Sequence, residues 1–229
     1  MNHFTKSFDY FKSLLEAGTP FALARFGDGE LSILRGEKIR NHEFQYDGER
    51  GFMAKIVEAI CYQHPDYFVG IGCPCCIGQK DFEWMRDVSC QPTCQLTYNN
   101  IFVNSNYKRF MAEIVPILEQ KNAIFTGPEE GRQKLPYQFG IEVNQNAWRF
   151  AEEYLLELVD LILNESRPRI FLFSAGPLSE YLIHRAHIVA PEHTYIDIGS
   201  TLDPLLFGHP TRGYHTEGSP TSNKICYWG

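Results

Sequence analysis

The chain has 229 residues, of which 44% are hydrophobic and 21% are charged, a composition typical of a globular protein rather than a disordered one. Its formal net charge is −7, and its lysine and arginine residues are scattered along the sequence. These features argue against a nucleic-acid partner, because phosphate backbones are bound by clustered positive charge. The length suits one large core, so we expect residues 1–229 to form a single domain.

The first 18 residues carry apolar side chains at helical spacing and contain neither a basic segment nor a continuous apolar one. This pattern predicts an amphipathic helix rather than a signal peptide. No stretch of the sequence approaches the roughly 18 uninterrupted apolar residues of a membrane span. We therefore expect a cytoplasmic protein without a membrane span, in which the seven cysteines are reduced.

Short apolar runs that end in glycine or a small residue alternate with segments of helical periodicity. The predicted strands are 20–27, 67–72, 122–127, 168–176 and 193–200, and the predicted helices are 50–62, 107–120, 147–163 and 178–189. This alternation predicts an α/β fold with a mainly parallel sheet and helices on both faces. In such folds ligands bind at the carboxyl ends of the strands, so we expect the functional residues there.

Two segments rich in turn-forming residues predict long loops, at 126–145 and at 208–229. The second segment, a C-terminal tail, carries four aromatic side chains: Tyr214, His215, Tyr227 and Trp228. Aromatic residues in a tail indicate that it packs back onto the body of the protein. The tail then either covers a site as a lid or docks as a purely structural element.

Directly after the first predicted strand, the sequence Arg-Phe-Gly-Asp-Gly-Glu places Asp28 and Glu30 beside two glycines. Carboxylates removed from water need a partner. Two hard oxygen donors at this spacing suit Mg²⁺ or Mn²⁺ that is bridged to the phosphates of a substrate. The alternative is that Asp28 caps a helix over residues 29–35, with Glu30 in its first turn.

A second candidate region follows the strand that ends at residue 173. Ser174, Ala175 and Gly176 precede a helix, where small residues let a phosphate or a ribose approach exposed backbone amides. The alternative is a tight turn that binds nothing. Asp197 lies near the end of the last predicted strand, in "YIDIG", and could hold a ribose hydroxyl, act on the acceptor, or serve as a buried structural residue.

Five cysteines lie within residues 73–94 and offer a possible tetrahedral zinc site. They are Cys73, Cys75, Cys76, Cys90 and Cys94. Their spacing differs from that of standard zinc knuckles, so we interpret them as free thiols and keep zinc as the alternative.

Three segments together resemble the GT-D-type glycosyltransferases, a family first described as a domain of unknown function. They are "ALARFGDGELSIL" (22–34), "IFLFSAGPLSEYLIHRA" (170–186) and "YIDIGSTLD" (195–203). The Arg-Phe-Gly-Asp-Gly-Glu signature is present in full as residues 25–30. The resemblance implies a Rossmann-like fold, a nucleoside diphosphate sugar as donor, and a divalent metal bound through Asp28 and Glu30.

On this basis we expect a metal-dependent enzyme that transfers a hexose or a related sugar from a donor such as a UDP-sugar to a hydroxyl of a glycan or glycoprotein. We expect the donor to contact Arg25, Phe26 and Gly27. Together with Mn²⁺ or Mg²⁺, the Arg25 guanidinium would neutralise the charge that develops on the leaving diphosphate. An ion pair between Arg25 and Asp28 or another acid is the alternative role.

In the tail, Arg212 is a candidate ligand for the pyrophosphate. By analogy with other metal-dependent sugar transferases, His215 is a candidate metal ligand, and the alternative is an ordinary surface histidine. Four acids are candidates for the residue that deprotonates the acceptor hydroxyl: Glu129, Glu130, Asp197 and Asp203.

Two other classes of protein remain alternatives. The segments "ARFGDGE" and "YIDIGST" faintly resemble the glycine-bearing loop of S-adenosylmethionine-dependent methyltransferases, although neither has the full glycine run. A non-catalytic module that binds zinc or a nucleotide is the third possibility, and the acid pair argues against it.

Overall fold

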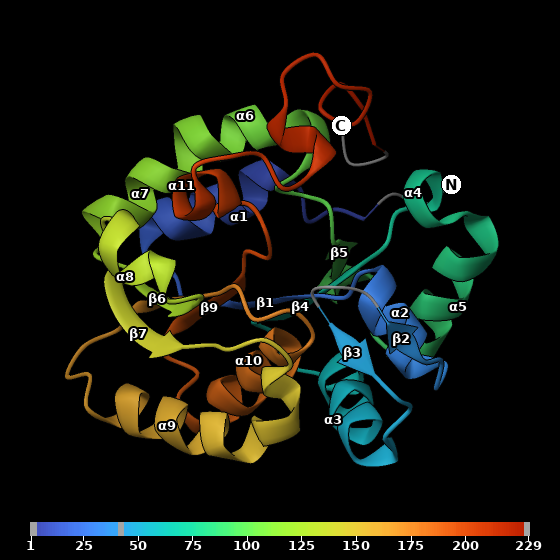
Figure 1. The fold of residues 1–229 in the computed structure, drawn as a ribbon, viewed down its shortest axis with the longest axis horizontal. Coiled ribbons are helices and arrows are strands. Elements are labelled where there is room, and N and C mark those ends of the chain that lie inside the picture. The colour runs from blue at the N-terminus through green and yellow to red at the C-terminus, as the bar shows by residue number, and fades with distance from the viewer. Residues whose placement is uncertain (1–3, 41–43, 227–229) are drawn as a thin grey trace.

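The computed structural model describes residues 4–40 and 44–226. Tyr227 and Trp228 lie outside the described residues. Within the described residues a seven-stranded sheet has the order β5-β4-β1-β9-β8-β6-β7 (Figure 1). Its strands are β1 (Ala22–Arg25), β4 (Tyr67–Ile71), β5 (Leu96–Tyr98), β6 (Ile124–Gly127), β7 (Gln138–Glu142), β8 (Ile170–Phe173) and β9 (Thr194–Asp197). All neighbouring strands pair in parallel, which confirms the predicted sheet.

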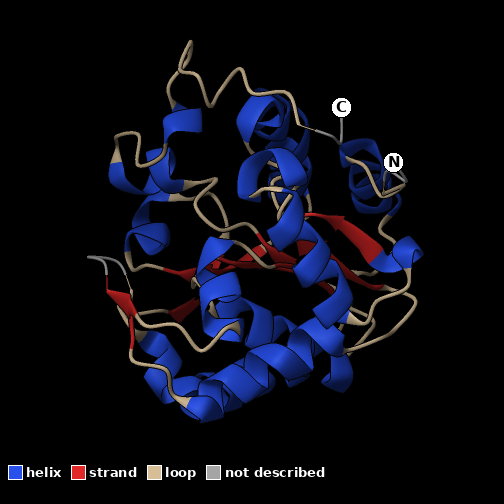
Figure 2. Cartoon of the chain, turned by 90° about the vertical axis from the view of Figure 1, so that its right-hand side faces the viewer, coloured by secondary structure: helices blue, strands red, loops and turns tan. Residues whose placement is uncertain are grey.

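Helices cover both faces of the sheet, as Figure 2 shows in a view along its edge. One face packs against α3 (Arg50–Cys61), α5 (Gln79–Ser89), α9 (Ala151–Leu163) and α10 (Leu178–Val189). The opposite face packs against α1 (Phe8–Ala17) and a continuous helical segment. That segment consists of α6 (Tyr107–Arg109), a π-helical turn (Phe110–Ile114) and α7 (Val115–Gln120).

The alternation of side chains along the buried strands produces these two layers. In β1, Ala22 and Ala24 face one hydrophobic cluster, and Leu23 faces the other. In β8, Phe171 and Leu172 divide in the same way. Each of these strands is buried along its whole length, which explains why they read as continuous apolar runs in the sequence.

All five predicted strands are present, and two further strands form the edges of the sheet. The prediction of a long loop at 126–145 is wrong, because this segment contains α8 (Glu130–Lys134) and β7. β7 is an edge strand whose residues are mostly partly exposed, so it lacks the apolar run that marks the central strands. β5, at the opposite edge, has only three residues. Partial exposure of β7 and the short length of β5 therefore account for the two omissions.

Three further short elements lie near the carboxyl edge of the sheet. α2 (Asp28–Leu34) follows β1, and a small antiparallel hairpin of β2 (Ile39–Arg40) and β3 (Gln45–Tyr46) comes next. α11 (Asp203–Phe207) follows β9 and ends at Gly208 in the left-handed conformation. No helix among the described residues is long and apolar enough to cross a membrane.

The described part of the tail, residues 208–226, packs back onto the body of the protein. The buried Tyr214 lies in a short 3₁₀ turn (Gly213–His215), and its hydroxyl is 2.7 Å from Oγ of Ser200. Its ring also lies edge-on to Tyr107, at 5.2 Å between centroids. The tail is therefore held against the loop after β9 and the start of α6.

Candidate functional site

A cavity of about 960 Å³ opens at the carboxyl edge of the sheet, and we call it the edge cavity. The loops that follow β1, β5, β6, β8 and β9 all contribute to its wall, and so does the tail. This is the expected position for a ligand site in an open parallel sheet. The volume lies at the upper end of the range for small-molecule sites.

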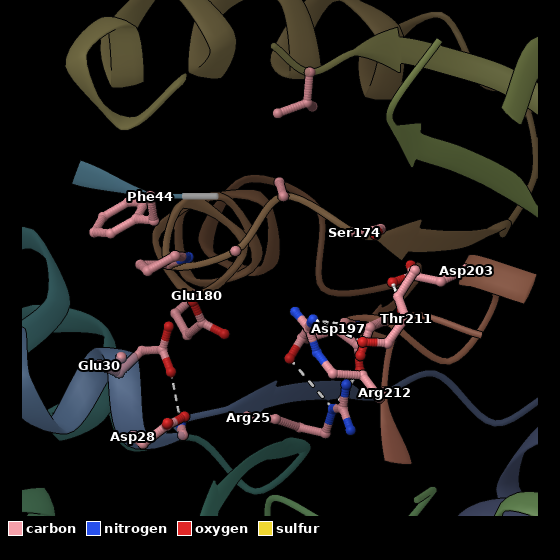
Figure 3. Close-up of a pocket in the computed structure, with 18 of the residues that line it drawn as sticks. Arg25, Asp28, Glu30, Phe44, Ser174, Glu180, Asp197, Asp203, Thr211 and Arg212 are labelled. Atoms are coloured by element: carbon pink, nitrogen blue, oxygen red, sulfur yellow. Dashed lines mark hydrogen bonds and ion pairs between the residues drawn. The ribbon is translucent and has the colours of Figure 1, made fainter. Parts of the chain in front are cut away.

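Asp28 and Glu30 both line the edge cavity, but they differ in environment (Figure 3). Gly27 is the N-cap of α2, so the alternative in which Asp28 caps this helix is wrong. Oε2 of Glu30 accepts a hydrogen bond of 2.6 Å from the N–H of Gly27. Glu30 is buried while Asp28, in the first turn, is exposed. Glu30 thus stabilises the start of α2 and still faces the cavity.

Arg25 and Asp197 form an ion pair at the ends of the adjacent strands β1 and β9. Nε of Arg25 donates to the backbone oxygen of Asp197 at 2.7 Å and lies 3.2 Å from Oδ2 of the same residue. Nη1 of Arg25 donates to the backbone oxygen of Asn99 at 2.9 Å. Both members of the pair are buried. The ion-pair role of Arg25 is therefore realised, with Asp197 rather than Asp28 as partner, and Arg25 also lines the cavity.

Glu180, which the sequence did not single out, lies beside this pair in the first turn of α10. It is only 1% exposed, and its Oε2 has no hydrogen-bond partner among the described residues. Figure 3 shows its carboxyl group between those of Glu30 and Asp197. A carboxyl group just after "SAGP", at the start of the helix that follows this loop, is the sequence signal that could have identified it.

Glu30, Glu180 and Asp197 form a buried carboxyl triad with raised pKa values. Burial raises the pKa of Glu30 to about 7, the hydrogen bond from Gly27 opposes this shift, and the charges of Asp197 and Asp28 add to it. Burial and the charge of Glu30 raise the pKa of Glu180 well above its ordinary value. Burial also raises the pKa of Asp197, although Arg25 counteracts the effect. One guanidinium cannot balance three buried carboxylates, so the triad either retains protons or binds a further cation.

The small residues after β8 lie where the sequence placed them. Ser174, Ala175 and Gly176 line the edge cavity. The N–H of Ala175 donates to Oγ of Ser179 at 3.1 Å, and Gly176 has a φ of +55°. The structure thus brings this loop together with Asp28, Glu30, Arg25 and Asp197, which come from distant parts of the chain.

Of three other residues predicted to belong to the site, one lines the edge cavity and two do not. Arg212 lines the edge cavity. The side chain of Phe26 is buried in the hydrophobic core and does not line it. Nδ1 of His215 accepts hydrogen bonds from the N–H groups of Thr211 and Arg212, and its Nε2 donates to the backbone oxygen of Ser200 at 2.9 Å. His215 therefore holds the tail in place, and metal binding would require it to give up one of these bonds.

Comparison with solved structures shows that the chain shares the fold of the domain of unknown function 1792. A structure described as a new glycosyltransferase of this domain from Streptococcus sanguinis aligns with a TM-score of 0.63 and 16% identity, over 97% of this chain and 90% of that chain. A second structure, described as having a distinct glycosyltransferase fold, gives 0.55 and 16%. A selenomethionine-substituted structure of the domain gives 0.57 and 14%; each of the last two covers 88% of this chain and 81% of the other.

These likenesses confirm the fold that the resemblance to GT-D-type glycosyltransferases implied. No protein-family model and no curated protein sequence matches the chain.

The raised pKa of Glu30 predicts a specific pH dependence of stability. Between about pH 4.5 and pH 7 the folded chain holds a proton at Glu30 that the unfolded chain has lost, so this group makes the protein less stable as the pH rises. His184 and His187, whose pKa values burial lowers to about 4, act in the opposite direction below about pH 6.5. When the stability of Glu30→Gln is compared with that of the wild type, the contribution of the two histidines cancels, because both proteins contain them.

We therefore expect Glu30→Gln to differ least from the wild type near pH 5 and to exceed its stability by roughly 1–3 kcal/mol at pH 8. The amide preserves the helix cap, since glutamine also serves at this position. Urea unfolding at four pH values, without added divalent cations, measures the difference. Glu153→Gln, in the exposed first turn of α9, is the control and should follow the wild type. A constant difference between Glu30→Gln and the wild type would contradict the prediction.

Gly199 provides a second test, because it lets Arg25 reach its position. Its φ is +49°, and a Cβ there would lie 2.7 Å from Nη2 of Arg25. Gly208 has a φ of +75° with open space around it, so Gly208→Ala should cost only the backbone strain, about 1–2 kcal/mol. We expect Gly199→Ala to cost clearly more, because Arg25 must also move. Equal losses in denaturant unfolding would show that Arg25 adapts without cost.

Proposed function

We propose that this protein is a metal-dependent glycosyltransferase, which moves a hexose or a related sugar from a nucleoside diphosphate sugar to a hydroxyl of a glycan or glycoprotein. Uridine is our first candidate for the nucleoside. One observation carries the proposal: a buried carboxyl triad with an unpaired oxygen, beside Arg25 at a cavity on the carboxyl edge of the sheet. The shared fold with structures described as glycosyltransferases supports it.

The charge of the edge cavity supports a divalent cation as part of the site. Among the described residues that line the cavity, five are acids and two are arginines. They are Asp28, Glu30, Glu180, Asp197 and Asp203, together with Arg25 and Arg212. A diphosphate would be repelled by this excess of carboxyl groups, unless a cation lies between them and the phosphate oxygens.

Three acids of the cavity that Arg25 does not engage fit such an ion. Asp28, Glu30 and Glu180 offer hard oxygen donors from α2 and α10, which suits Mn²⁺ or Mg²⁺. Asp197 is excluded from this set, because Arg25 and the N–H of Gly199 already engage its carboxylate. His215 is excluded because both of its ring nitrogens bond to the backbone. When bound, the ion neutralises the negative charge that develops on the departing diphosphate.

The rest of the cavity suits the other parts of a nucleotide sugar. Arg212 adds a positive charge on the tail side for a phosphate, and the loop 174–176 gives small residues that allow close backbone contact. Near the β2–β3 hairpin the wall contains three large apolar side chains, Ile39, Phe44 and Trp148. A flat nucleobase or the face of a sugar ring fits such a surface.

Position in the fold supports one choice of catalytic base for the acceptor hydroxyl. Glu129 and Glu130 do not line the edge cavity, whereas Asp197 and Asp203 do. Asp197 holds Arg25, and we therefore propose Asp203, at the start of α11, as the base. Its Oδ2 accepts a hydrogen bond from the hydroxyl of Thr211 in the tail, which fixes the orientation of the carboxylate.

The decisive test is the substitution Glu30→Gln, measured by hydrolysis of a panel of nucleotide sugars. We expect a loss of about 10²-fold or more in turnover, because the amide removes the charge that binds the ion. Wild-type activity should disappear in EDTA and return with excess Mn²⁺ or Mg²⁺.

Glu153→Gln again serves as the control, because it removes an exposed acid that does not line the cavity from the first turn of a helix. It should leave turnover unchanged. Near-normal activity of Glu30→Gln, or activity that survives EDTA, would contradict the proposal. Thermal stabilisation by S-adenosylhomocysteine, and not by UDP with Mn²⁺, would indicate a methyltransferase instead.

A further inference from the structure

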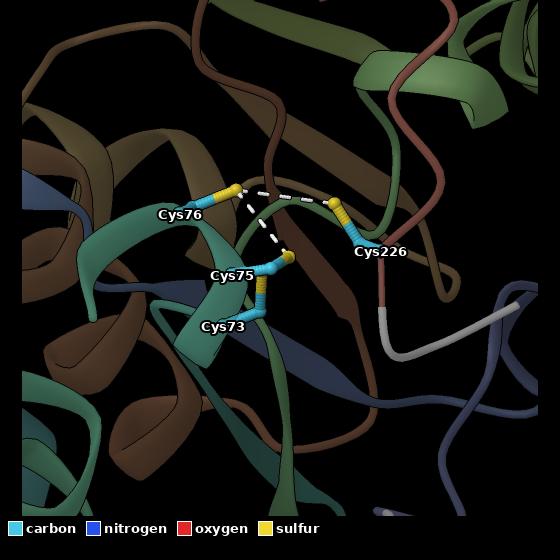
Figure 4. Close-up of side chains that lie close together, drawn as sticks. All are labelled: Cys73, Cys75, Cys76 and Cys226. Atoms are coloured by element: carbon cyan, nitrogen blue, oxygen red, sulfur yellow. Dashed lines mark hydrogen bonds between the residues drawn. The ribbon is translucent and has the colours of Figure 1, made fainter. Parts of the chain in front are cut away.

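Four cysteines gather at a second place in the fold, close to the wall of the edge cavity. Cys73 precedes the short helix α4 (Pro74–Ile77), which contains Cys75 and Cys76, and Cys226 comes from the end of the described tail (Figure 4). All four Sγ atoms lie within 4.8 Å of one another. We call these residues the cysteine cluster. Its members are separated by up to 153 positions in the sequence, so spacing alone could not identify it.

The cluster differs from the set that the sequence suggested as an alternative zinc site. Cys90 and Cys94 do not belong to it, because Cys90 ends α5 and Cys94 lies in the turn Thr93–Gln95. Cys226 takes the fourth position instead. The poor spacing of Cys73, Cys75 and Cys76 therefore reflects a ligand set completed from the other end of the chain.

The sulfur positions are close to those of four ligands around one ion. Cys76 Sγ is 3.9 Å from both Cys75 Sγ and Cys226 Sγ, and Cys73 Sγ is 2.8 Å from Cys75 Sγ. A tetrahedral zinc ion with Zn–S bonds of about 2.3 Å separates its ligand atoms by about 3.8 Å. The two distances from Cys76 match this spacing, whereas the Sγ atoms of Cys73 and Cys75 lie about 1 Å closer and would move apart around an ion.

The surroundings of the sulfur atoms are suited to thiolates. Nδ2 of Asn100 lies 3.2 Å from Cys73 Sγ, 3.3 Å from Cys76 Sγ and 3.1 Å from Cys226 Sγ. Nδ2 of Asn104 lies 3.3 Å from Cys226 Sγ. Both amides can donate to sulfur, and such donors stabilise the negative charge of metal-bound thiolates.

A positive charge also lies beside the cluster. Nζ of Lys224 donates to the backbone oxygen of Cys75 at 2.9 Å. Four thiolates around one divalent ion carry a net charge of −2, and the ammonium group of Lys224 partly offsets it. The same lysine, two residues before Cys226, ties the tail to α4.

We propose that Cys73, Cys75, Cys76 and Cys226 bind one Zn²⁺ ion in a closed tetrahedral site that holds the C-terminal tail to the body of the protein. Four thiolates leave no open coordination position, so the site is structural. The proposal stands apart from the proposed transferase activity, because it uses none of the residues that would bind the donor or its metal.

The site would nevertheless affect the edge cavity through the tail. Thr211, Arg212 and Tyr214 line the cavity, and the tail continues from them to Cys226. Asn100 both lines the cavity and contacts three of the sulfur atoms. Loss of the ion would therefore free the end of the segment that forms one wall.

Elemental analysis of the full-length protein, purified with a reductant and without a chelator, tests the site directly. We expect one zinc per chain in the wild type, and a loss of zinc in Cys226→Ser and Cys75→Ser. Cys90→Ser and Cys94→Ser, which change cysteines outside the cluster, should retain it. Replacement of zinc by Co²⁺ should give the visible absorption of a tetrahedral thiolate complex in the wild type and in the two controls.

The proposal is wrong if the reduced wild type binds no zinc after incubation with the metal, or if the controls lose zinc as readily as Cys226→Ser. It is equally wrong if mass spectrometry finds a disulfide within the cluster of the reduced, zinc-treated protein.

Limited proteolysis of the wild type with and without zinc tests the role of the ion and requires no variant to fold. Cleavage within residues 208–226 should be slow with zinc and at least several-fold faster after chelation. Equal rates would show that the ion does not hold the tail. Because neither experiment measures sugar transfer, both results are independent of the proposed activity.

Discussion

The balance of charge at the ends of β1 and β9 is the constraint on which the candidate site depends. Arg25 neutralises Asp197 in a buried position, and the local backbone is built around its side chain. Gly199 adopts a left-handed conformation beside Nη2, and Gly70 in β4 allows the backbone of Asn99, whose oxygen accepts from Nη1, to lie close by. With its charge engaged there, Arg25 cannot also balance Glu30 and Glu180. The protein therefore contains two further buried carboxyl groups, and a cation from outside the chain would stabilise their ionised forms.

These buried carboxyl groups link the stability of the protein to the binding of a cation. A carboxyl group with a raised pKa releases its proton when a cation arrives, so cation affinity at the triad should rise with pH through the range near pH 7. Many functional sites share this property: groups that lower the stability of the protein on their own favour the binding of a ligand that stabilises them.

The sequence predicted the central strands and most of the surrounding helices because their burial is complete and their periodicity strong. It also predicted that the loops of Glu30, Gly176 and Asp197 meet at one edge, since parallel strands bring their carboxyl ends together. It did not predict β5, which has only three residues, or β7, which is partly exposed, because neither strand forms a clear apolar run in the sequence. Glu180 was missed because its burial depends on packing between α10 and distant elements, and Cys226 because its partners lie about 150 residues away. Such relations are set by tertiary structure. The acid soon after "SAGP" is a local signal for Glu180, but Cys226 has no such signal in its neighbourhood.

The two proposed metal sites have different ligand atoms, so each would select a different metal ion. Carboxylate oxygens at Glu30 and Glu180 prefer Mg²⁺ or Mn²⁺, whereas four thiolates select zinc. Asn100 lies between the two regions, because it lines the cavity and contacts the sulfur atoms. A chelator strong enough to remove zinc would therefore disturb the tail wall as well as the carboxylate site. Recovery of activity with Mn²⁺ alone would show that the wall re-forms without zinc, whereas recovery that needs both ions would show that the tail must be held for the donor to bind.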